Sequence, residues 1–119
     1  MMILVDTSVW VDHLRHSEPD LVDLLRDGSV LTHPLIIEEL ACGSLAKREE
    51  FIELMSALPK AAEAEHHEIL DLITDQKLFS TGLGSVDVHI IASALLEGAL
   101  VWSKDRTLAR EANRLGAGR

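Results

Sequence analysis

Short, unbroken apolar runs alternate along this chain with longer segments whose apolar residues recur at helical spacing. Three runs, 3–5, 29–32 and 99–102, suit short strands that are buried on both faces, which is typical of a parallel sheet. Proline and glycine mark the ends of helical segments, as Pro34 and Gly43 do. Helices are expected at 9–14, 19–27, 34–41, 47–58, 65–78, 85–97 and 106–115. The pattern therefore predicts an α/β fold in which helices flank a short central parallel sheet.

The chain has 119 residues, the length of one ordinary domain, so we expect residues 1–119 to form a single unit. Hydrophobic residues make up 47%, which is enough to fill a core without a disulfide or a structural metal. The single cysteine, Cys42, excludes a disulfide framework and a thiolate zinc site. The opening MMILVD is too short for a signal peptide, and no run reaches the roughly 18 apolar residues of a membrane span. We therefore expect a cytoplasmic protein without membrane contact.

Acidic residues outnumber basic ones, because 20 Asp and Glu stand against 11 Lys and Arg, a net charge of −9. This balance argues against a broad basic face that holds nucleic acid. The charges are unevenly distributed, since residues 99–119 hold 5 basic and 2 acidic residues. Taken alone, such a basic end is typical of a solvent-exposed helix face.

Three aspartates occupy positions that the predicted fold brings to one edge of the sheet. Asp6 directly follows the first strand, and Asp105 follows the last strand after two residues. Asp87 lies in the first turn of a helix, where the helix dipole favours an ionised carboxylate. Ligands bind at this edge of parallel sheets, and carboxylates gathered there need a counter-charge to stay ionised. Hard oxygen ligands select Mg²⁺ or Mn²⁺, so the pattern indicates metal-dependent phosphate chemistry.

Four segments extend this pattern over nearly the whole chain: MILVDTSVWVDHLR, IIEELACGSL, GSVDVHIIASAL and LVWSKDRTLAREA. In this order they resemble the PIN-domain ribonucleases, specifically the VapC-type toxins of VapBC toxin–antitoxin pairs. The resemblance implies an acidic quartet that binds one or two divalent ions and cleaves single-stranded or looped RNA, such as tRNA or rRNA, to stop translation. It also implies a homodimer and a cognate VapB-type antitoxin.

The resemblance assigns catalysis and metal binding to four acids, which are Asp6, Glu39, Asp87 and Asp105. Asp6 and Asp87 would be the main ligands of Mg²⁺ or Mn²⁺, and the other two would complete the site directly or through water. Helical spacing leaves Glu38 and Glu39 equivalent. The family's habit of glutamate followed by leucine selects Glu39.

RNA binding by an acidic protein needs local positive charge, because phosphate affinity comes from lysine and arginine releasing counterions. Lys104, Arg106 and Arg110 flank Asp105 and are the candidate contacts to RNA phosphates. Ser103 takes the place of a threonine that the family often has two residues before its last aspartate. It keeps a hydroxyl for hydrogen bonds to metal ligands or phosphate.

Aromatic and imidazole side chains receive no role in the chemistry. Trp10 and Trp102 lie beside apolar stretches and are expected in the core rather than stacked on RNA bases. None of the six histidines has the spacing of a metal site, and His89 is expected to pack or to face solvent.

Three alternatives are weighed against the nuclease. A receiver-like phosphoacceptor domain needs an aspartate after a middle strand, where Thr32 and His33 stand. A phosphohydrolase of the haloacid dehalogenase type needs a second aspartate two residues after Asp6, where Ser8 stands. The third alternative is a PIN fold that only binds partners without catalysis, and the complete acidic quartet favours the enzyme over it.

Overall fold

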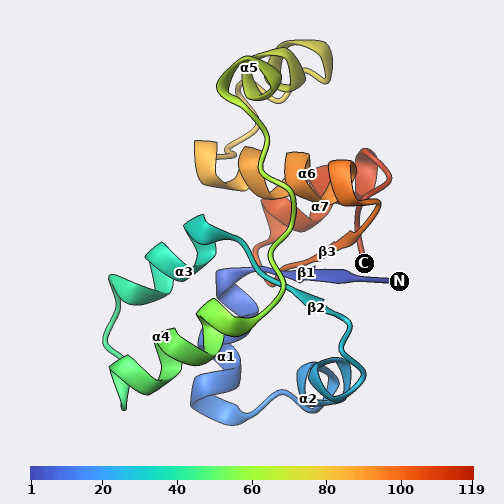
Figure 1. Ribbon diagram of the computed structural model, residues 1–119. Helices are drawn as coiled ribbons and strands as arrows, with labels where there is room; N and C mark the ends of the chain where they lie inside the picture. The colour runs from blue at the N-terminus through green and yellow to red at the C-terminus, as the bar shows by residue number, and fades with distance from the viewer.

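A central parallel sheet organises the chain. In the computed structural model, which describes residues 1–119, the strands β1 (Ile3–Val5), β2 (Val30–Leu31) and β3 (Leu100–Trp102) lie in the order β2-β1-β3 (Figure 1). Both pairs are parallel, and Leu4 of the central strand lies opposite Leu31 and Val101. The predicted α/β fold with a short parallel sheet is confirmed.

Two further extended segments cover the edges of this sheet. Thr32 forms a parallel bridge with Lys60 beyond β2, and Val101 forms one with Gly118 beyond β3. Backbone hydrogen bonds make these bridges; the Val101 N–H, for example, donates to the Ala117 carbonyl at 2.7 Å. Because both outer strands find partners, neither presents a long row of unpaired backbone groups to solvent.

Seven helices surround the sheet, and each lies where helical spacing predicts one. They are α1 (Thr7–His16), α2 (Pro19–Arg26), α3 (Pro34–Ala41), α4 (Arg48–Ala57), α5 (His66–Asp75), α6 (Ser85–Glu97) and α7 (Arg106–Arg114). Two boundaries differ most: α1 already begins at Thr7, two residues before its predicted start, and α5 ends at Asp75, three residues before its predicted end. Asp6 has the extended backbone of an N-cap (φ −70°, ψ 157°), so the helix begins directly after the strand. The hydroxyls of Thr7 and Ser8 are thereby held on a helix end at the edge of the sheet.

The helices form two groups on opposite sides of the sheet. In Figure 1, α6 and α7 lie above the strands, and α1 and α4 lie below them. Side chains from both groups close on β1, and Leu4, Ile36, Ile90 and Leu108 are fully buried between the layers. The prediction for Trp10 is confirmed, since it belongs to this core.

Trp102 is only partly buried, which differs from the core position expected for it. Its ring packs against the core on one side, and the Arg119 guanidinium lies 4.3 Å from the ring centroid. Leu100 is partly buried as well, whereas Val101 between them is buried, so Leu100 and Trp102 share the less covered face of β3. This stacking of an arginine on an indole face is a cation–π contact.

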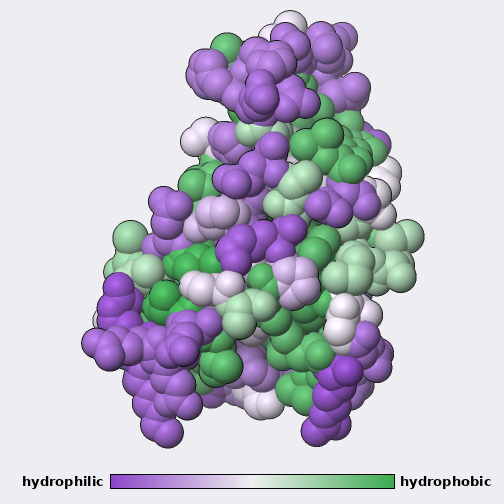
Figure 2. All heavy atoms as spheres, in the orientation of Figure 1, coloured by the Kyte–Doolittle hydropathy of each residue, from purple (hydrophilic) through white to green (hydrophobic).

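α5 projects from the rest of the molecule (Figure 1). It packs on α6 through a small apolar cluster of its own, formed by Ile69, Leu78, Val88 and Ala92. Hydrophilic side chains cover most of the projecting part in Figure 2. None of the helices combines the length and the apolar character that a membrane crossing requires.

Candidate active site

Asp6 is the most firmly oriented acid of the predicted quartet. It lies between β1 and α1, its side chain is buried, and its backbone N–H donates to the Trp102 carbonyl at 2.9 Å. Its Oδ2 accepts two hydrogen bonds of 2.8 Å, one from the Ser8 hydroxyl and one from the Ser103 hydroxyl. Two short hydrogen bonds on one oxygen fix the plane of the carboxylate. The chain places no donor on Oδ1, which stays available to a ligand.

The two hydroxyls around Asp6 are themselves oriented by the backbone. The Lys104 N–H donates to Ser8 Oγ at 2.9 Å, and the Asp105 N–H donates to Ser103 Oγ at 3.0 Å. Each hydroxyl therefore accepts a hydrogen bond from the backbone and donates one to the carboxylate. The loop between β3 and α7 thus fixes Asp6 through two relays. Ser103 was a predicted site residue, whereas Ser8 was not, because residues 6–8 were expected to form an ordinary polar turn.

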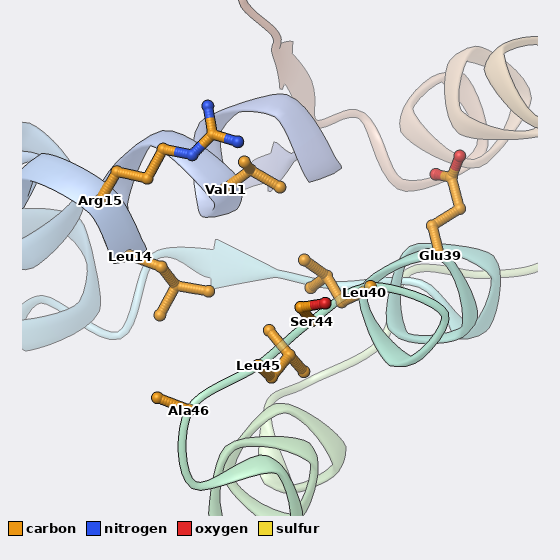
Figure 3. A pocket seen from close by; sticks show the side chains of 9 residues that line it. Val11, Leu14, Arg15, Glu39, Leu40, Ser44, Leu45 and Ala46 are labelled. Atoms are coloured by element: carbon orange, nitrogen blue, oxygen red, sulfur yellow. The ribbon is translucent and has the colours of Figure 1, made fainter.

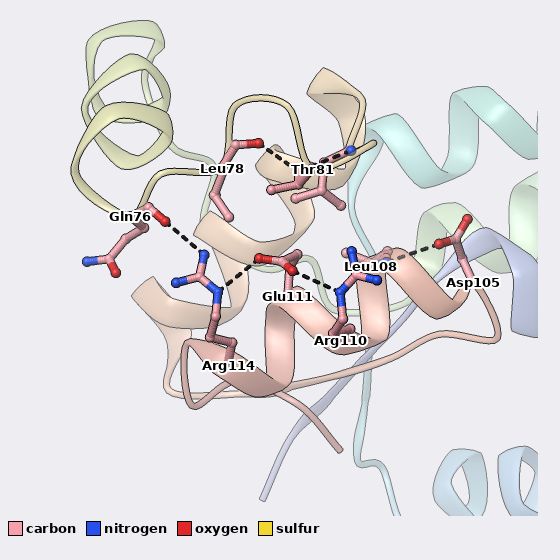
Figure 4. Close-up of polar contacts among 9 residues, drawn as sticks. Gln76, Leu78, Thr81, Asp105, Leu108, Arg110, Glu111 and Arg114 are labelled. Atoms are coloured by element: carbon pink, nitrogen blue, oxygen red, sulfur yellow. Dashed lines mark hydrogen bonds and ion pairs between the residues drawn. The ribbon is translucent and has the colours of Figure 1, made fainter.

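Asp105 follows this loop and begins α7. Its Oδ1 accepts from the Leu108 N–H at 3.0 Å, which is an N-cap hydrogen bond (Figure 4). The cap uses one oxygen of an otherwise exposed carboxylate. Asp105 can therefore both start the helix and present its second oxygen to a ligand at the same edge of the sheet.

Glu39 comes to the site from α3. Its Oε1 accepts a hydrogen bond of 2.8 Å from the hydroxyl of Thr7, the first residue of α1. No comparable contact joins Glu38 to α1. Of the two glutamates that helical spacing left equivalent, Glu39 is thus the one that lies beside Asp6. Thr7 was not a predicted site residue, and its position directly after Asp6 is the only signal that the sequence offers.

Asp87 approaches from the start of α6. Its Oδ2 accepts from the Gly84 N–H at 3.3 Å, within the turn that begins its own helix. Partial burial raises the pKa of Asp87 above its ordinary value, and the charges of Asp6, Asp105 and Glu39 raise it further. The hydrogen bond from Gly84 opposes this rise without cancelling it. All four predicted acids therefore share one electrostatic neighbourhood.

The donor set suits a hard divalent cation. Carboxylate oxygens are the ligands that Mg²⁺ and Mn²⁺ prefer. The pKa of Asp87 is raised first by burial and then by the charges of Asp6, Asp105 and Glu39, so a bound cation would favour its ionised form. The acids do not close into a compact cage, since no group of three His, Cys, Asp or Glu side chains converges on one metal position. This spacing agrees with the habit of Mg²⁺, which uses one or two carboxylates and keeps several waters.

Lys104 and Arg106, two of the candidate RNA contacts, differ in their surroundings. The Lys104 ammonium contacts the carboxylates of Asp12 and Glu18, the latter at 2.6 Å. Arg106, at the first position of α7, is exposed and forms no ion pair. A phosphate could reach Arg106 directly, whereas at Lys104 it would compete with two carboxylates.

Arg110, the third candidate, shares a buried acid with a neighbour (Figure 4). Its Nε donates to Glu111 at 3.1 Å, and Arg114 Nε donates to the other oxygen of Glu111 at 2.9 Å. These two guanidinium groups lower the pKa of Glu111 below its ordinary value. Arg114 also donates to the Gln76 carbonyl at 2.8 Å, which joins α7 to the end of α5. The Arg110 side chain is still 61% exposed, so its outer nitrogens face solvent.

An apolar groove of about 640 Å³ lies beside the acids, between α1 and the segment from α3 to α4 (Figure 3). Glu39 and Arg15 supply its charged groups, and the other labelled side chains are mostly aliphatic. In Figure 3 the Glu39 carboxylate points away from the aliphatic lining. The groove therefore adjoins the acidic site and adds no further acid or cation to it beyond Arg15.

Comparison with known proteins identifies the family of this chain. The PIN domain family model matches residues 3–113. Ribonuclease VapC32 from two strains of Mycobacterium tuberculosis is 44% identical over 108 residues, which are 90% of this chain and 87% of the relative. The crystal structure of PAE2754 from Pyrobaculum aerophilum superposes with a TM-score of 0.63 at 17% identity, over 98% of this chain and 90% of that chain. At this identity the structural similarity shows a shared fold.

These similarities overturn two of the alternatives. A receiver-like domain and a phosphohydrolase of the haloacid dehalogenase type both belong to other families than the one matched over residues 3–113. The structure agrees, because β2 runs into Thr32 and His33 without a phosphoacceptor aspartate, and the Ser8 hydroxyl serves the Asp6 carboxylate.

Proposed function

Since the chain belongs to the PIN-domain family and, within it, to the VapC-type ribonuclease toxins, we propose that it is a Mg²⁺- or Mn²⁺-dependent endoribonuclease, the toxin of a toxin–antitoxin pair. The observation that carries the proposal is the Asp6 carboxylate, which two hydroxyls orient in the shared neighbourhood of Asp87, Asp105 and Glu39. We assign the nuclease to residues 1–119 as one unit.

Four acids would hold the metal in this proposal. Asp6 and Asp87 serve as the main ligands, and Glu39 and Asp105 complete the site directly or through water. A metal ion held there would lower the pKa of a bound water and offset the charge of the phosphate. Ser8 and Ser103 keep one oxygen of Asp6 occupied, so that its other oxygen faces the ligand. A carboxylate next to the attacking water would accept its proton as the water oxygen bonds to phosphorus. The P–O bond to the leaving ribose oxygen then breaks in line, and that oxygen takes up a proton from solvent.

The substrate in this proposal is structured or looped RNA, such as tRNA or rRNA, whose cleavage stops translation in the cytoplasm. Arg106 and the exposed face of Arg110 are the cations best situated to contact phosphates, with Lys104 and Ser103 beside them. Their small number agrees with the net charge of −9, which limits non-specific attraction to RNA. Specificity would then depend on the shape of an exposed loop, since bases must be unstacked to be reached.

The partners in this proposal are a VapB-type antitoxin and a second copy of the chain. A basic side chain of the antitoxin would enter the acidic site and neutralise the carboxylates that otherwise repel one another. Such a contact blocks the substrate and removes the electrostatic cost of the free site. The VapC name of the relatives supports the antitoxin partner.

The decisive experiment is to sequence the 5′ ends of RNA after incubating purified protein with total tRNA and rRNA. We expect one or a few dominant cuts in loops when millimolar Mg²⁺ or Mn²⁺ is present, and none when EDTA is added. Uncut RNA under all metal conditions would instead support a PIN fold that only binds partners. Cutting that EDTA leaves unchanged would contradict the metal-dependent mechanism.

A further inference from the structure

Lys104 lies in the loop between β3 and α7, and its side chain crosses to another part of the molecule. Its ammonium contacts Asp12 of α1 and Glu18, the residue that precedes α2, at 2.6 Å from the Glu18 Oε2. The Glu18 backbone is held in turn, because its N–H donates to His13 Nδ1 at 3.0 Å. One side chain thus joins the loop to two segments that are more than 80 residues away in the sequence.

The same residue is also held through its backbone. The Lys104 N–H donates to Ser8 Oγ at 2.9 Å, and Ser8 lies one helical turn before Asp12. Residues four apart share one face of a helix, so α1 receives the backbone and the side chain of Lys104 on the same face. We call Lys104, Asp12 and Glu18 the lysine clamp.

The residues on either side of Lys104 connect the lysine clamp to the acidic site. Ser103, just before it, donates to Asp6, and Asp105, just after it, caps α7. We propose that Lys104 is a positioning residue: through Asp12 and Glu18 it holds the β3–α7 loop against α1, and so fixes the Ser103 hydroxyl on Asp6 and the place of Asp105. The inference rests on the proposed nuclease function for its effect on turnover, while its structural part does not.

Charge argues against RNA binding as the main role of this lysine. Two carboxylates already surround the ammonium, so the lysine clamp carries a net negative charge toward any phosphate. Exposed ion pairs contribute little to global stability. The effect of the clamp should therefore be sought in the order of the loop and in turnover, and only weakly in the melting temperature.

Amide hydrogen exchange on the free protein tests the structural part. In Lys104→Met we expect exchange across 103–108 to accelerate about tenfold, while β1 and α6 keep their protection. Lys77→Met, which removes an exposed lysine that forms no ion pair, should leave this segment unchanged. Unchanged exchange in Lys104→Met would overturn the inference, whether or not the protein cuts RNA.

Steady-state cleavage tests the functional part. Lys104→Met, the double variant Asp12→Asn/Glu18→Gln, and the triple variant should each lower kcat about tenfold, because they break one shared unit and their effects do not add. KM and its salt dependence should stay as in the wild type, and Lys104→Arg should recover most of the turnover. Asp20→Asn/Asp23→Asn removes two exposed carboxylates of α2 and should keep the wild-type kcat.

An RNA-binding lysine would behave in the opposite way. Lys104→Met would then raise KM and reduce the salt slope by about 0.7 to 0.9, while kcat at saturating RNA held steady. Removing Asp12 and Glu18 charges would free the ammonium and tighten RNA binding without lowering kcat. Either result would overturn the positioning role.

Discussion

Asp6 and Asp87 come to the acidic site from different elements and are supported very differently. Asp6 is buried and receives hydroxyl hydrogen bonds from α1 and from the loop after β3, each 2.8 Å long. Asp87 receives a single longer hydrogen bond, 3.3 Å, from the turn that begins its own helix. Partial burial, together with the charges of Asp6, Asp105 and Glu39, raises the pKa of Asp87 above its ordinary value. An acid at a strand end is therefore fixed by the fold, whereas an acid on a separate helix still lacks its counter-charge.

Glu39 and Thr7 connect the Asp6 side to α3. The Thr7 hydroxyl donates to Glu39 from the first turn of α1, while its neighbour Ser8 donates to Asp6. Two consecutive hydroxyls at the start of one helix thus donate hydrogen bonds to two acids.

The asymmetry between Asp6 and Asp87 leads to three predictions, which follow from the largest expected effect to the smallest.

Asp6→Asn should reduce RNA cleavage to below about one hundredth of the wild-type rate. The change is nearly isosteric and keeps an oxygen for the two serine hydroxyls, so the fold should be preserved while the ligand charge is lost. Loss of a residue that only supports a ligand already costs about ten- to hundredfold, and a ligand itself should cost more. Turnover of the purified variant checks this, with Asp20→Asn as the control for an exposed acid. Cleavage near the wild-type rate would remove Asp6 from the site.

Ser8→Ala and Ser103→Ala should each lower kcat about ten- to hundredfold, because each removes one of the two hydroxyls that orient Asp6. Ser103→Thr keeps the hydroxyl and should retain most of the activity. Ser56→Ala, at an exposed position of α4, is the matched control and should be neutral. If both alanine variants cleave at the wild-type rate, the two hydroxyl hydrogen bonds to Asp6 stabilise the fold and do not contribute to catalysis.

Asp87→Asn should raise the melting temperature of the metal-free protein at neutral pH by a few degrees. The variant removes a negative charge that partial burial and the neighbouring carboxylates make unfavourable. A raised pKa in the folded state means that ionisation of Asp87 destabilises the fold above that pKa. The advantage of the variant should disappear as the pH falls below the unfolded value of about 3.9. Thermal melting between pH 3 and 7 measures this dependence, at roughly one-unit steps.

Adding a divalent metal ion tests the same difference between the wild type and Asp87→Asn. Millimolar Mg²⁺ or Mn²⁺ should raise the melting temperature of the wild type, because the ion binds the folded state, and should raise that of Asp87→Asn less. A variant less stable than the wild type at neutral pH would show that the helix dipole and the Gly84 hydrogen bond outweigh the repulsion at Asp87.

Much of the fold follows from local patterns in the sequence. The apolar run Ile3–Val5 and the prolines at 19 and 34 predict a buried strand and two helix starts, and the structure has all three. Spacing failed at residues 7–8, because a strand that runs straight into a helix leaves no apolar period to mark the boundary. Trp102 differed because it shares the less covered face of β3 with Leu100, and how well each face is covered depends on packing between distant segments.

The acids could be named from the sequence, but their support could not. Asp6, Asp87 and Asp105 can be recognised because they lie at strand and helix ends, where ligands bind in parallel sheets. Two of the supporting hydroxyls lie far away in the chain: Ser103 is 97 residues from Asp6, and Thr7 is 32 residues from Glu39. A hydrogen bond over such a distance exists only once packing has brought the two segments together. Sequence therefore determined which groups this protein possesses, and tertiary structure decided which of them are oriented, which are paired and which keep an uncompensated charge.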